Sequence, residues 1–125
     1  MKYFLSLGSN IDPKQNLDAA IVALGKIFND MNCSSTHQTK SEGFEGDDFL
    51  NLVISGNCSL SYEALNKELK SIEDNSNRNR DAPKFSSRTL DIDIVLQLSD
   101  EEEIVFESDE IAKYNFVSEP LKELL

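Results

Sequence analysis

The sequence predicts an α+β fold in which an antiparallel sheet carries helices on one face. Short runs of strand-forming residues recur along the chain, two longer stretches place apolar residues at helical spacing, and the order is strand, helix, strand, strand, helix, strand. This order is typical of the ferredoxin-like βαββαβ arrangement, a four-stranded antiparallel sheet with two helices on one face. The 125 residues and their 39% hydrophobic content suit a single domain spanning residues 1–125.

The first half of the chain supplies two strands and a helix. Residues 3–7 are rich in strand formers, and the Gly-Ser-Asn sequence at 8–10 predicts a turn after them. Asp12 is placed to cap a helix with Pro13 at its first position. Residues 32–40 are polar and predict a second, exposed strand. The apolar stripe of the helix is expected to contain Leu17, Ala20, Ile21, Leu24, Ile27 and Phe28.

The second half repeats the pattern and adds a tail. Residues 49–55 are so apolar that we expect a strand buried on both faces. Ser61 predicts the start of a second helix, and residues 89–98 alternate as a strand does. A short strand at 104–106 and a helical end should follow. Polar loops are expected at 41–47, 74–87 and 100–103.

Charge and composition exclude several classes of function. The chain has 12 Lys and Arg against 23 Asp and Glu, a net charge of −11, so it is not expected to bind nucleic acid or anionic membranes. Its apolar runs are too short to span a bilayer. Cys33 and Cys58 are isolated and His37 is the only histidine, which disfavours disulfide frameworks, zinc sites and histidine triads. We therefore expect a cytoplasmic protein, and a monomer.

The arginines of the chain are concentrated in one segment. All three arginines, Arg78, Arg80 and Arg88, lie within eleven residues, and Lys84 lies among them. Because guanidinium groups bind phosphate oxygens through paired planar hydrogen bonds, this segment suits a polyphosphate ligand. The alternative is a solvated loop that balances nearby acids.

Two carboxylates follow directly after this segment. In a strand, Asp91 and Asp93 point to one face and Ile92 to the other. Adjacent carboxylates repel each other unless a cation lies between them, and Mg²⁺ commonly shares such ligands with nucleotide phosphates. Together with the arginines, the pair predicts phosphoryl transfer, although no glycine-rich Walker or kinase loop is present. The alternative is that the aspartates face solvent or pair with the neighbouring arginines.

Two aromatic residues and an amide suggest a site for a flat ligand. Phe49 begins the third strand just before Asn51, and Phe116 lies in the C-terminal segment. Two phenyl rings can enclose a heterocycle while an asparagine amide binds its edge. A phenylalanine taken alone, however, is more often simply part of the core.

These motifs resemble one enzyme family. Leu-Gly-Ser-Asn at 7–10, Asp-Phe-Leu-Asn at 48–51, and Arg-Thr-Leu-Asp-Ile-Asp at 88–93 are similar to motifs of 6-hydroxymethyl-7,8-dihydropterin pyrophosphokinase. The resemblance runs from about residue 2 to residue 98, with a weaker match at 116–121. It implies a ferredoxin-like fold and Mg²⁺-dependent transfer of pyrophosphate from ATP to 6-hydroxymethyl-7,8-dihydropterin, giving AMP, in folate biosynthesis.

The resemblance also implies a role for each motif residue. Asp91 and Asp93 correspond to the ligands of two Mg²⁺ ions that bridge the ATP phosphates. The pterin would lie between Phe49 and Phe116, with Asn51 at its edge. The implied ATP contacts are Glu73, Arg78, Arg80, Lys84 and Arg88, and the implied catalytic residues are Arg78, Arg88, Asp91 and Asp93.

The chain departs from the family pattern mainly on the ATP side. Ser108 stands where the family has a histidine, Tyr114 where it has an arginine, and Phe-Ser-Ser at 85–87 where it has Trp-Gly-Pro. We also expect a C-terminal part shorter than the family's. These departures keep open a non-catalytic relative that binds a pterin or nucleotide without phosphoryl transfer. A third alternative is an interaction module on the same scaffold.

Overall fold

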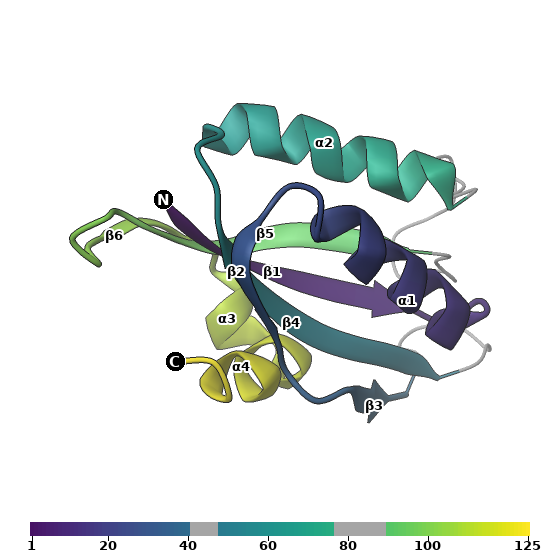
Figure 1. The fold of residues 1–125 in the computed structure, drawn as a ribbon. Coiled ribbons are helices and arrows are strands. Elements are labelled where there is room, and N and C mark those ends of the chain that lie inside the picture. Colours follow the sequence, from purple (N-terminus) through teal and green to yellow (C-terminus); the bar gives the residue numbers. More distant parts are fainter. Residues whose placement is uncertain (41–47, 77–89) are drawn as a thin grey trace.

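The protein folds into an antiparallel sheet with helices on both of its faces (Figure 1). The structure, a computed structural model, describes residues 1–40, 48–76 and 90–125. The strand order is β2-β4-β1-β5-β6, and β3 also pairs with β4. The elements are β1 (Lys2–Ser9), α1 (Pro13–Leu24), β2 (Asn29–Cys33), β3 (His37–Thr39), β4 (Phe49–Asn57), α2 (Tyr62–Asn75), β5 (Asp91–Leu98), β6 (Ile104–Glu107), α3 (Glu110–Lys113) and α4 (Asn115–Lys122).

The α+β class and the antiparallel sheet are confirmed, but the sheet is larger than the four strands expected. It has six strands, because residues 32–40 form parts of two strands and β6 adds an edge. At the junction of β2 and β3, the backbone N–H of Ser34 donates to the carbonyl of Val53, and the Ser34 hydroxyl accepts from the Val53 N–H. The side chain thus takes over one ladder bond where the two strands meet.

The helices also differ from the expectation of one covered face. α1 and α2 lie on one face of the sheet, whereas α3 and α4 lie against the other (Figure 1). Each face has its own apolar core. The core under α1 and α2 contains Leu5, Leu7, Leu17, Leu24, Ile54, Leu65, Leu69, Ile92 and Ile94, among others. The core under α4 contains Phe4, Val53, Val95, Leu96, Val117 and Leu121.

This double covering explains the composition of the central strands. β4 is buried over most of its length on both faces, as its apolar sequence predicted.

Within the described part of the chain, no helix is long and apolar enough to cross a membrane. Cys33 and Cys58 are free thiols.

The predicted start of α2 is confirmed and that of α1 is only partly right. The Ser61 hydroxyl accepts from the N–H of Ala64, which satisfies one of the unpaired amides of the first turn. Asp12 occupies the N-cap position of α1, but its backbone is left-handed, with φ 42°, and its side chain makes no cap hydrogen bond. The amide of Asn16 instead donates to the carbonyl of Ile11 at 2.6 Å.

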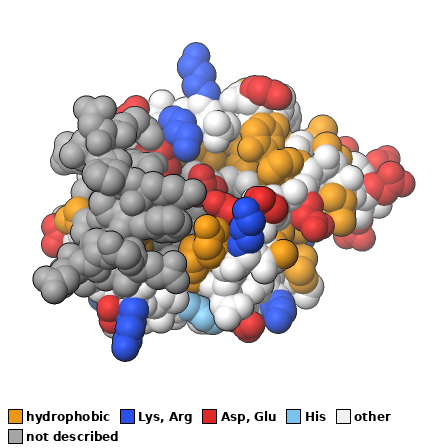
Figure 2. Space-filling model, turned by 180° about the vertical axis from the view of Figure 1, so that it is seen from behind, with side chains coloured by type: hydrophobic (Ala, Val, Ile, Leu, Met, Phe, Trp, Pro, Cys, Tyr) orange, Lys and Arg blue, Asp and Glu red, His pale blue; other side chains and the backbone are white. Residues whose placement is uncertain are grey.

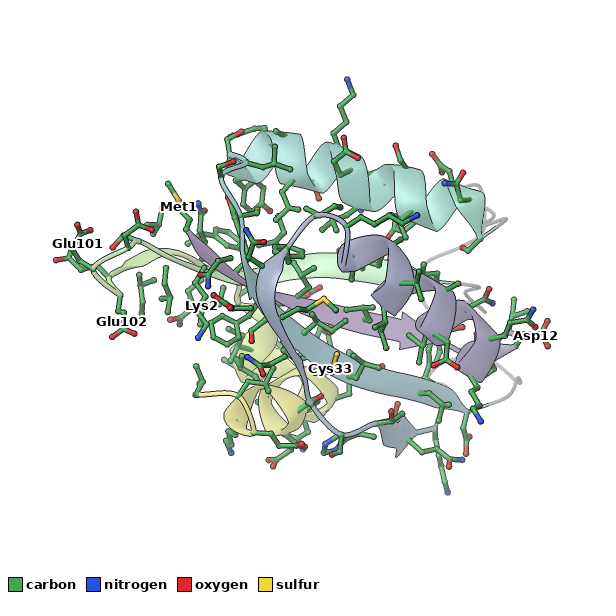
Figure 3. The ribbon with its side chains drawn as sticks, in the orientation of Figure 1. Met1, Lys2, Asp12, Cys33, Glu101 and Glu102 are labelled. Carbon is green, nitrogen blue, oxygen red and sulfur yellow. The ribbon has the colours of Figure 1, made fainter. Side chains whose placement is uncertain are left out.

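The two ends of the sheet differ in character. Met1 and the turn that carries Glu101 and Glu102 lie at one end, and Asp12 lies at the other (Figure 3). β1 continues through Ser9, so the predicted turn at residues 8–10 begins too early. Three of the sequence-predicted site residues, Asn51 of β4 and Asp91 and Asp93 of β5, pair with residues 6–8 of β1, toward the end near Asp12.

Candidate functional site

The aspartates of β5 lie on the face of the sheet that α1 and α2 leave uncovered. Ile92 and Ile94 belong to the core under α1 and α2. Because side chains alternate along a strand, Asp91 and Asp93 point to the opposite face, where both are half-buried. The predicted alternation is therefore confirmed.

The predicted pterin residues of β4 share this face. Leu50 and Leu52 pack into the core under α1 and α2, so Phe49 and Asn51 point to the other side of the sheet. Phe49 is half-buried, and Asn51 is only 4% exposed. Residues that are 40 positions apart in the sequence thus face the same space.

β1 lies between these two sets and forms the floor of the site. Gly8 pairs with Asn51 on one side and with Asp91 on the other. One row further along, Ser6 pairs with Val53 and with Asp93. Since neighbouring strands are about 4.8 Å apart, the Cα atoms of Asn51 and Asp91 are separated by roughly 10 Å.

Gly8 makes the close packing of this floor possible. A Cβ at this position would lie 3.0 Å from the Asn51 Oδ1 and 3.8 Å from the Phe49 ring. A glycine inside a strand often marks a close approach, and that signal was present in the sequence, although it was interpreted there as a turn. We call Phe49 and Asn51 the β4 wall of the site, and Asp91 and Asp93 the β5 wall. Because Gly8 has no side chain, the space between these two walls stays open at its base.

The Asn51 amide is held in one orientation. Its Nδ2 donates to the Thr39 hydroxyl at 2.8 Å, from the neighbouring strand β3. The amide oxygen then lies on the Gly8 side. An amide fixed in this way presents a defined hydrogen-bonding edge, which suits recognition of a heterocycle.

Asp93 of β5 has a strongly perturbed pKa. Burial raises the pKa of Asp93 to about 7, and the negative charges of Asp91, Glu110 and Glu73 add to that effect, opposed by Lys70. A carboxylate that resists ionisation among other acids would be stabilised by a cation. This side of the site is therefore electrostatically suited to a bound cation.

The donor set fits Mg²⁺ better than a metal held by protein ligands alone. Among the described residues, no group of three or more His, Cys, Asp or Glu side chains is arranged to hold a metal. Asp91 and Asp93 supply only two carboxylates, and Mg²⁺ is commonly bound by one or two carboxylates together with substrate phosphates. The arrangement thus matches an ion that arrives with a polyphosphate.

Glu73 lies behind this pair rather than beside it. Its side chain is fully buried and accepts a hydrogen bond from the backbone N–H of Ile92 at 2.7 Å, while Lys70 lies 3.4 Å away. It therefore anchors the strand between the two aspartates. The sequence spacing indicates this buried position, because Glu73 follows Leu65 and Leu69 at intervals of four and so lies on the buried face of α2.

The C-terminal helices add an aromatic group to the same face. Phe116, in the first turn of α4, packs against the core that contains Val53 and is stacked on Tyr114, with ring centroids 4.8 Å apart. No ring contact joins Phe49 to Phe116 in the described part of the chain. Viewed from behind, acidic side chains lie beside hydrophobic ones near the middle of the molecule (Figure 2).

The structure thus brings part of the predicted site together. Asp91, Asp93, Phe49 and Asn51 lie on one face around Gly8, Phe116 lies on the same face, and Glu73 lies beneath it. The predicted phosphate-binding residues Arg78, Arg80, Lys84 and Arg88 lie outside the described residues. Sequence reasoning missed Thr39 and Glu110, which contribute orientation and charge, and it interpreted Gly8, which contributes space, as part of a turn.

A comparison with protein families agrees with this geometry. The family model for 7,8-dihydro-6-hydroxymethylpterin-pyrophosphokinase matches residues 4–125. The match covers both walls of the site, its floor and the C-terminal helices.

Proposed function

Because the chain belongs to the 7,8-dihydro-6-hydroxymethylpterin-pyrophosphokinase family, we propose that it is an active, Mg²⁺-dependent member of it. The family transfers a pyrophosphoryl group from ATP to hydroxymethyldihydropterin in folate synthesis, and the resemblance seen in the sequence is confirmed. The observation that carries the proposal is the pairing of Gly8 with both Asn51 and Asp91, which sets a heterocycle-binding amide opposite a carboxylate pair. The proposal includes a single domain with a ferredoxin-like inner sheet, monomeric and cytoplasmic.

The carboxylate side is proposed to receive the triphosphate of ATP. Asp91 and Asp93 would hold two Mg²⁺ ions, and the raised pKa of Asp93 supports a cation there. Bound Mg²⁺ would neutralise phosphate charge and orient the triphosphate. Glu73 would keep the two carboxylates in place through its bond to the Ile92 N–H. Arg78 and Arg88 are proposed to contact the phosphates and act in catalysis, and Glu73, Arg80 and Lys84 to line the ATP site.

The amide side is proposed to receive the pterin. Asn51 would bind the edge of the ring system with the amide that Thr39 orients. Phe49 and Phe116 would contact its faces. The pterin hydroxyl oxygen would then form a bond to the β-phosphorus of ATP and lose its proton to solvent. The bond from that phosphorus to the oxygen bridging to the α-phosphate would break, and AMP would leave with that oxygen. Catalysis would consist mostly of positioning and charge neutralisation.

The test is an assay of AMP release with purified protein, ATP, Mg²⁺ and 6-hydroxymethyl-7,8-dihydropterin. We expect AMP and the pterin diphosphate in equal amounts, and none when either the pterin or Mg²⁺ is omitted. A folded preparation that binds both ligands and releases no AMP would refute the proposal.

Two observations favour the non-catalytic alternative. The Tyr114 ring, at the position of a family arginine, is stacked on Phe116, and the Ser108 hydroxyl, at the position of a histidine, accepts from the Glu110 N–H at 3.2 Å. Both side chains take part in local structure. Under this alternative the protein binds the pterin and shows no affinity for ATP with Mg²⁺, which calorimetric titration of each ligand would reveal.

A further inference from the structure

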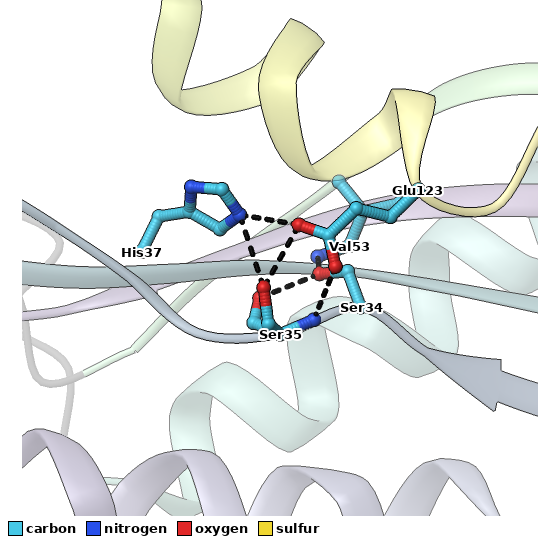
Figure 4. Close-up of polar contacts among 5 residues, drawn as sticks. All are labelled: Ser34, Ser35, His37, Val53 and Glu123. Atoms are coloured by element: carbon cyan, nitrogen blue, oxygen red, sulfur yellow. Dashed lines mark hydrogen bonds and ion pairs between the residues drawn. The ribbon is translucent and has the colours of Figure 1, made fainter.

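Three polar side chains meet beyond the C-terminal end of α4, and one of them, His37, belongs to the strand that pairs with β4 (Figure 4). Glu123 directly follows α4, and its carboxylate accepts from the Ser35 backbone N–H at 2.8 Å, the Ser35 hydroxyl at 2.8 Å and His37 Nε2 at 2.5 Å. We call these three residues the Glu123 cluster. It joins the segment between β2 and β3 to the C-terminal end of α4, 86 residues away from His37.

The Glu123 cluster has the residue types of a nucleophilic triad but not its geometry. The Ser35 hydroxyl lies 3.3 Å from His37 Nε2, and the Glu123 carboxylate contacts that same nitrogen. A serine triad needs the serine at one ring nitrogen and the acid at the other, so that the acid orients the ring while the ring removes the serine proton. A hydrolytic role is therefore excluded, and the contacts require another explanation.

The lowered pKa of Glu123 indicates that its carboxylate attaches α4 to the segment containing Ser35 and His37. A carboxylate at the C-terminal end of a helix is disfavoured by the helix dipole. The pKa of Glu123 is nevertheless lowered to about 2, first by the Ser35 N–H and then by the side chains of His37 and Ser35. The three donors favour the ionised form of Glu123, so α4 is attached here through a charged group.

α4 connects this attachment to the proposed pterin site. Phe116 lies in the first turn of α4 and Glu123 just beyond its last, so seven residues and roughly 10 Å of helix separate them. Between them, Val117 and Leu121 pack against the sheet. Since a helix moves largely as a rigid unit, fixing its C-terminal end limits how far the Phe116 ring can shift across the sheet.

We propose that Glu123 is a positioning residue for the pterin: the Glu123 cluster holds α4 against the sheet and thereby holds Phe116 in contact with the bound ring. This inference rests on the proposed function, because it assigns Phe116 to the pterin. Glu123 contacts neither substrate, so its loss acts through α4 on pterin binding and leaves the phosphate chemistry nearly intact.

One arm of the test follows Phe116 without any substrate. The chain contains no tryptophan, so Phe116→Trp introduces a single fluorescent reporter at the position in question. Adding Glu123→Ala should shift its emission to longer wavelength and lower its anisotropy, because the ring becomes more exposed and more mobile. Glu119→Ala is the matched control, since it removes an exposed carboxylate of α4 that forms an ion pair with Lys122 at 3.4 Å.

The second arm is kinetic and uses the chain with Phe116 intact. Glu123→Ala should raise the KM for the pterin about tenfold, with kcat and the KM for ATP within about twofold of the parent. Ser35→Ala, which removes only one of the three donors, should give a smaller change in the same direction. Identical emission and identical pterin KM for Glu123→Ala and Glu119→Ala would overturn the inference.

The two arms separate the inference from the proposed function. If the parent protein releases no AMP, the proposed function fails. The fluorescence measurement still tests whether the Glu123 cluster holds Phe116 in place. If Glu123→Ala fails to fold by circular dichroism, Glu123→Gln replaces it, because the amide can still accept from Ser35 but loses the charge. A fall in kcat together with equal rises in the KM for the pterin and the KM for ATP would indicate general loss of structure. That result would contradict a positioning role.

Discussion

The β4 wall and the β5 wall of the candidate site differ in what holds their polar groups in place. On β4, Asn51 is neutral, buried and fixed by a 2.8 Å hydrogen bond to Thr39. On β5, Asp93 lies among other acids, and burial together with their charges raises its pKa to about 7. One wall is complete without a ligand, whereas the other carries repulsion that a cation would relieve.

Under the proposed function, this difference would allow a small acidic protein to bind two unlike substrates on one sheet face. The heterocycle would meet a preorganised neutral edge, which costs little to bind. The polyphosphate would meet carboxylates that favour it only with Mg²⁺, so binding of the nucleotide would be coupled to the metal. Gly8 of β1 lies between the two walls and pairs with Asn51 on one side and Asp91 on the other.

The largest expected effect comes from breaking the β5 wall. Asp93→Ala should lower kcat by about a thousandfold, because electrostatic stabilisation of the transferring group is lost. Pterin affinity should change by less than about threefold, since the amide wall is untouched. Steady-state turnover and fluorescence titration of the pterin measure the two quantities.

The matched control is Asp18→Ala, which removes an exposed carboxylate from α1, on the other face of the sheet. It should leave both quantities unchanged. Turnover by Asp93→Ala at the parent rate would remove the metal assignment.

Breaking the β4 wall should produce the opposite pattern. Asn51→Ala removes the amide edge, and loss of one or two hydrogen bonds should weaken pterin binding by about tenfold to a hundredfold. Nucleotide binding with Mg²⁺ should be preserved. Calorimetric titration of each ligand measures both, and loss of nucleotide affinity as large as that of pterin affinity would show that the walls are not independent.

A smaller effect is expected at the floor. In Gly8→Ala the new Cβ would lie 3.0 Å from the Asn51 Oδ1, so the amide must shift by a few tenths of an ångström. We expect pterin KM to rise by about threefold to tenfold and stability to fall by about 1 kcal/mol. Gly25→Ala is the control, because its Cβ would meet its nearest neighbour at 3.4 Å. Equal, negligible effects of the two substitutions would argue against a crowded floor.

The last prediction concerns stability and its dependence on pH. The folded pKa of Asp93, about 7, exceeds the ordinary value of 3.8, so the folded state binds more protons between these values and stability from this group falls as pH rises through them. Without metal, Asp93→Asn should therefore be more stable than the parent at pH 8, by about 1 to 2 kcal/mol, and the gap should close near pH 4. Urea unfolding at both pH values checks this, and an unchanged gap would contradict the assigned repulsion.

Much of the site could be predicted because it depends on local patterns. The alternation at residues 91–94 predicted that the two aspartates share one face opposite the isoleucines, and the apolar run at 49–55 predicted a strand buried on both faces. Gly8 was misjudged because a glycine after an apolar run looks like a turn until the partner strand is known. The helix-face position of Glu73 was readable from its spacing, but its bond to Ile92 was not.

Contacts between distant segments were beyond prediction. Nothing local shows that Glu123 meets Ser35 and His37, since pairing of residues more than 80 positions apart depends on how α4 lies across the sheet. The split of residues 32–40 into two strands likewise depends on the bonds of Ser34 to Val53 in the neighbouring strand. These features arise from tertiary packing that overrides local preference.

The most direct test of the account is calorimetric titration of a non-hydrolysable ATP analogue into the parent protein and into Asp93→Ala, with Mg²⁺ and with EDTA, at saturating hydroxymethyl pterin. We predict tight binding to the parent with Mg²⁺ only, and binding at least about tenfold weaker to Asp93→Ala. Equal affinity in Mg²⁺ and EDTA would contradict the cation-dependent wall. Pterin binding without any nucleotide binding to the parent would contradict the enzymatic function and favour the non-catalytic relative.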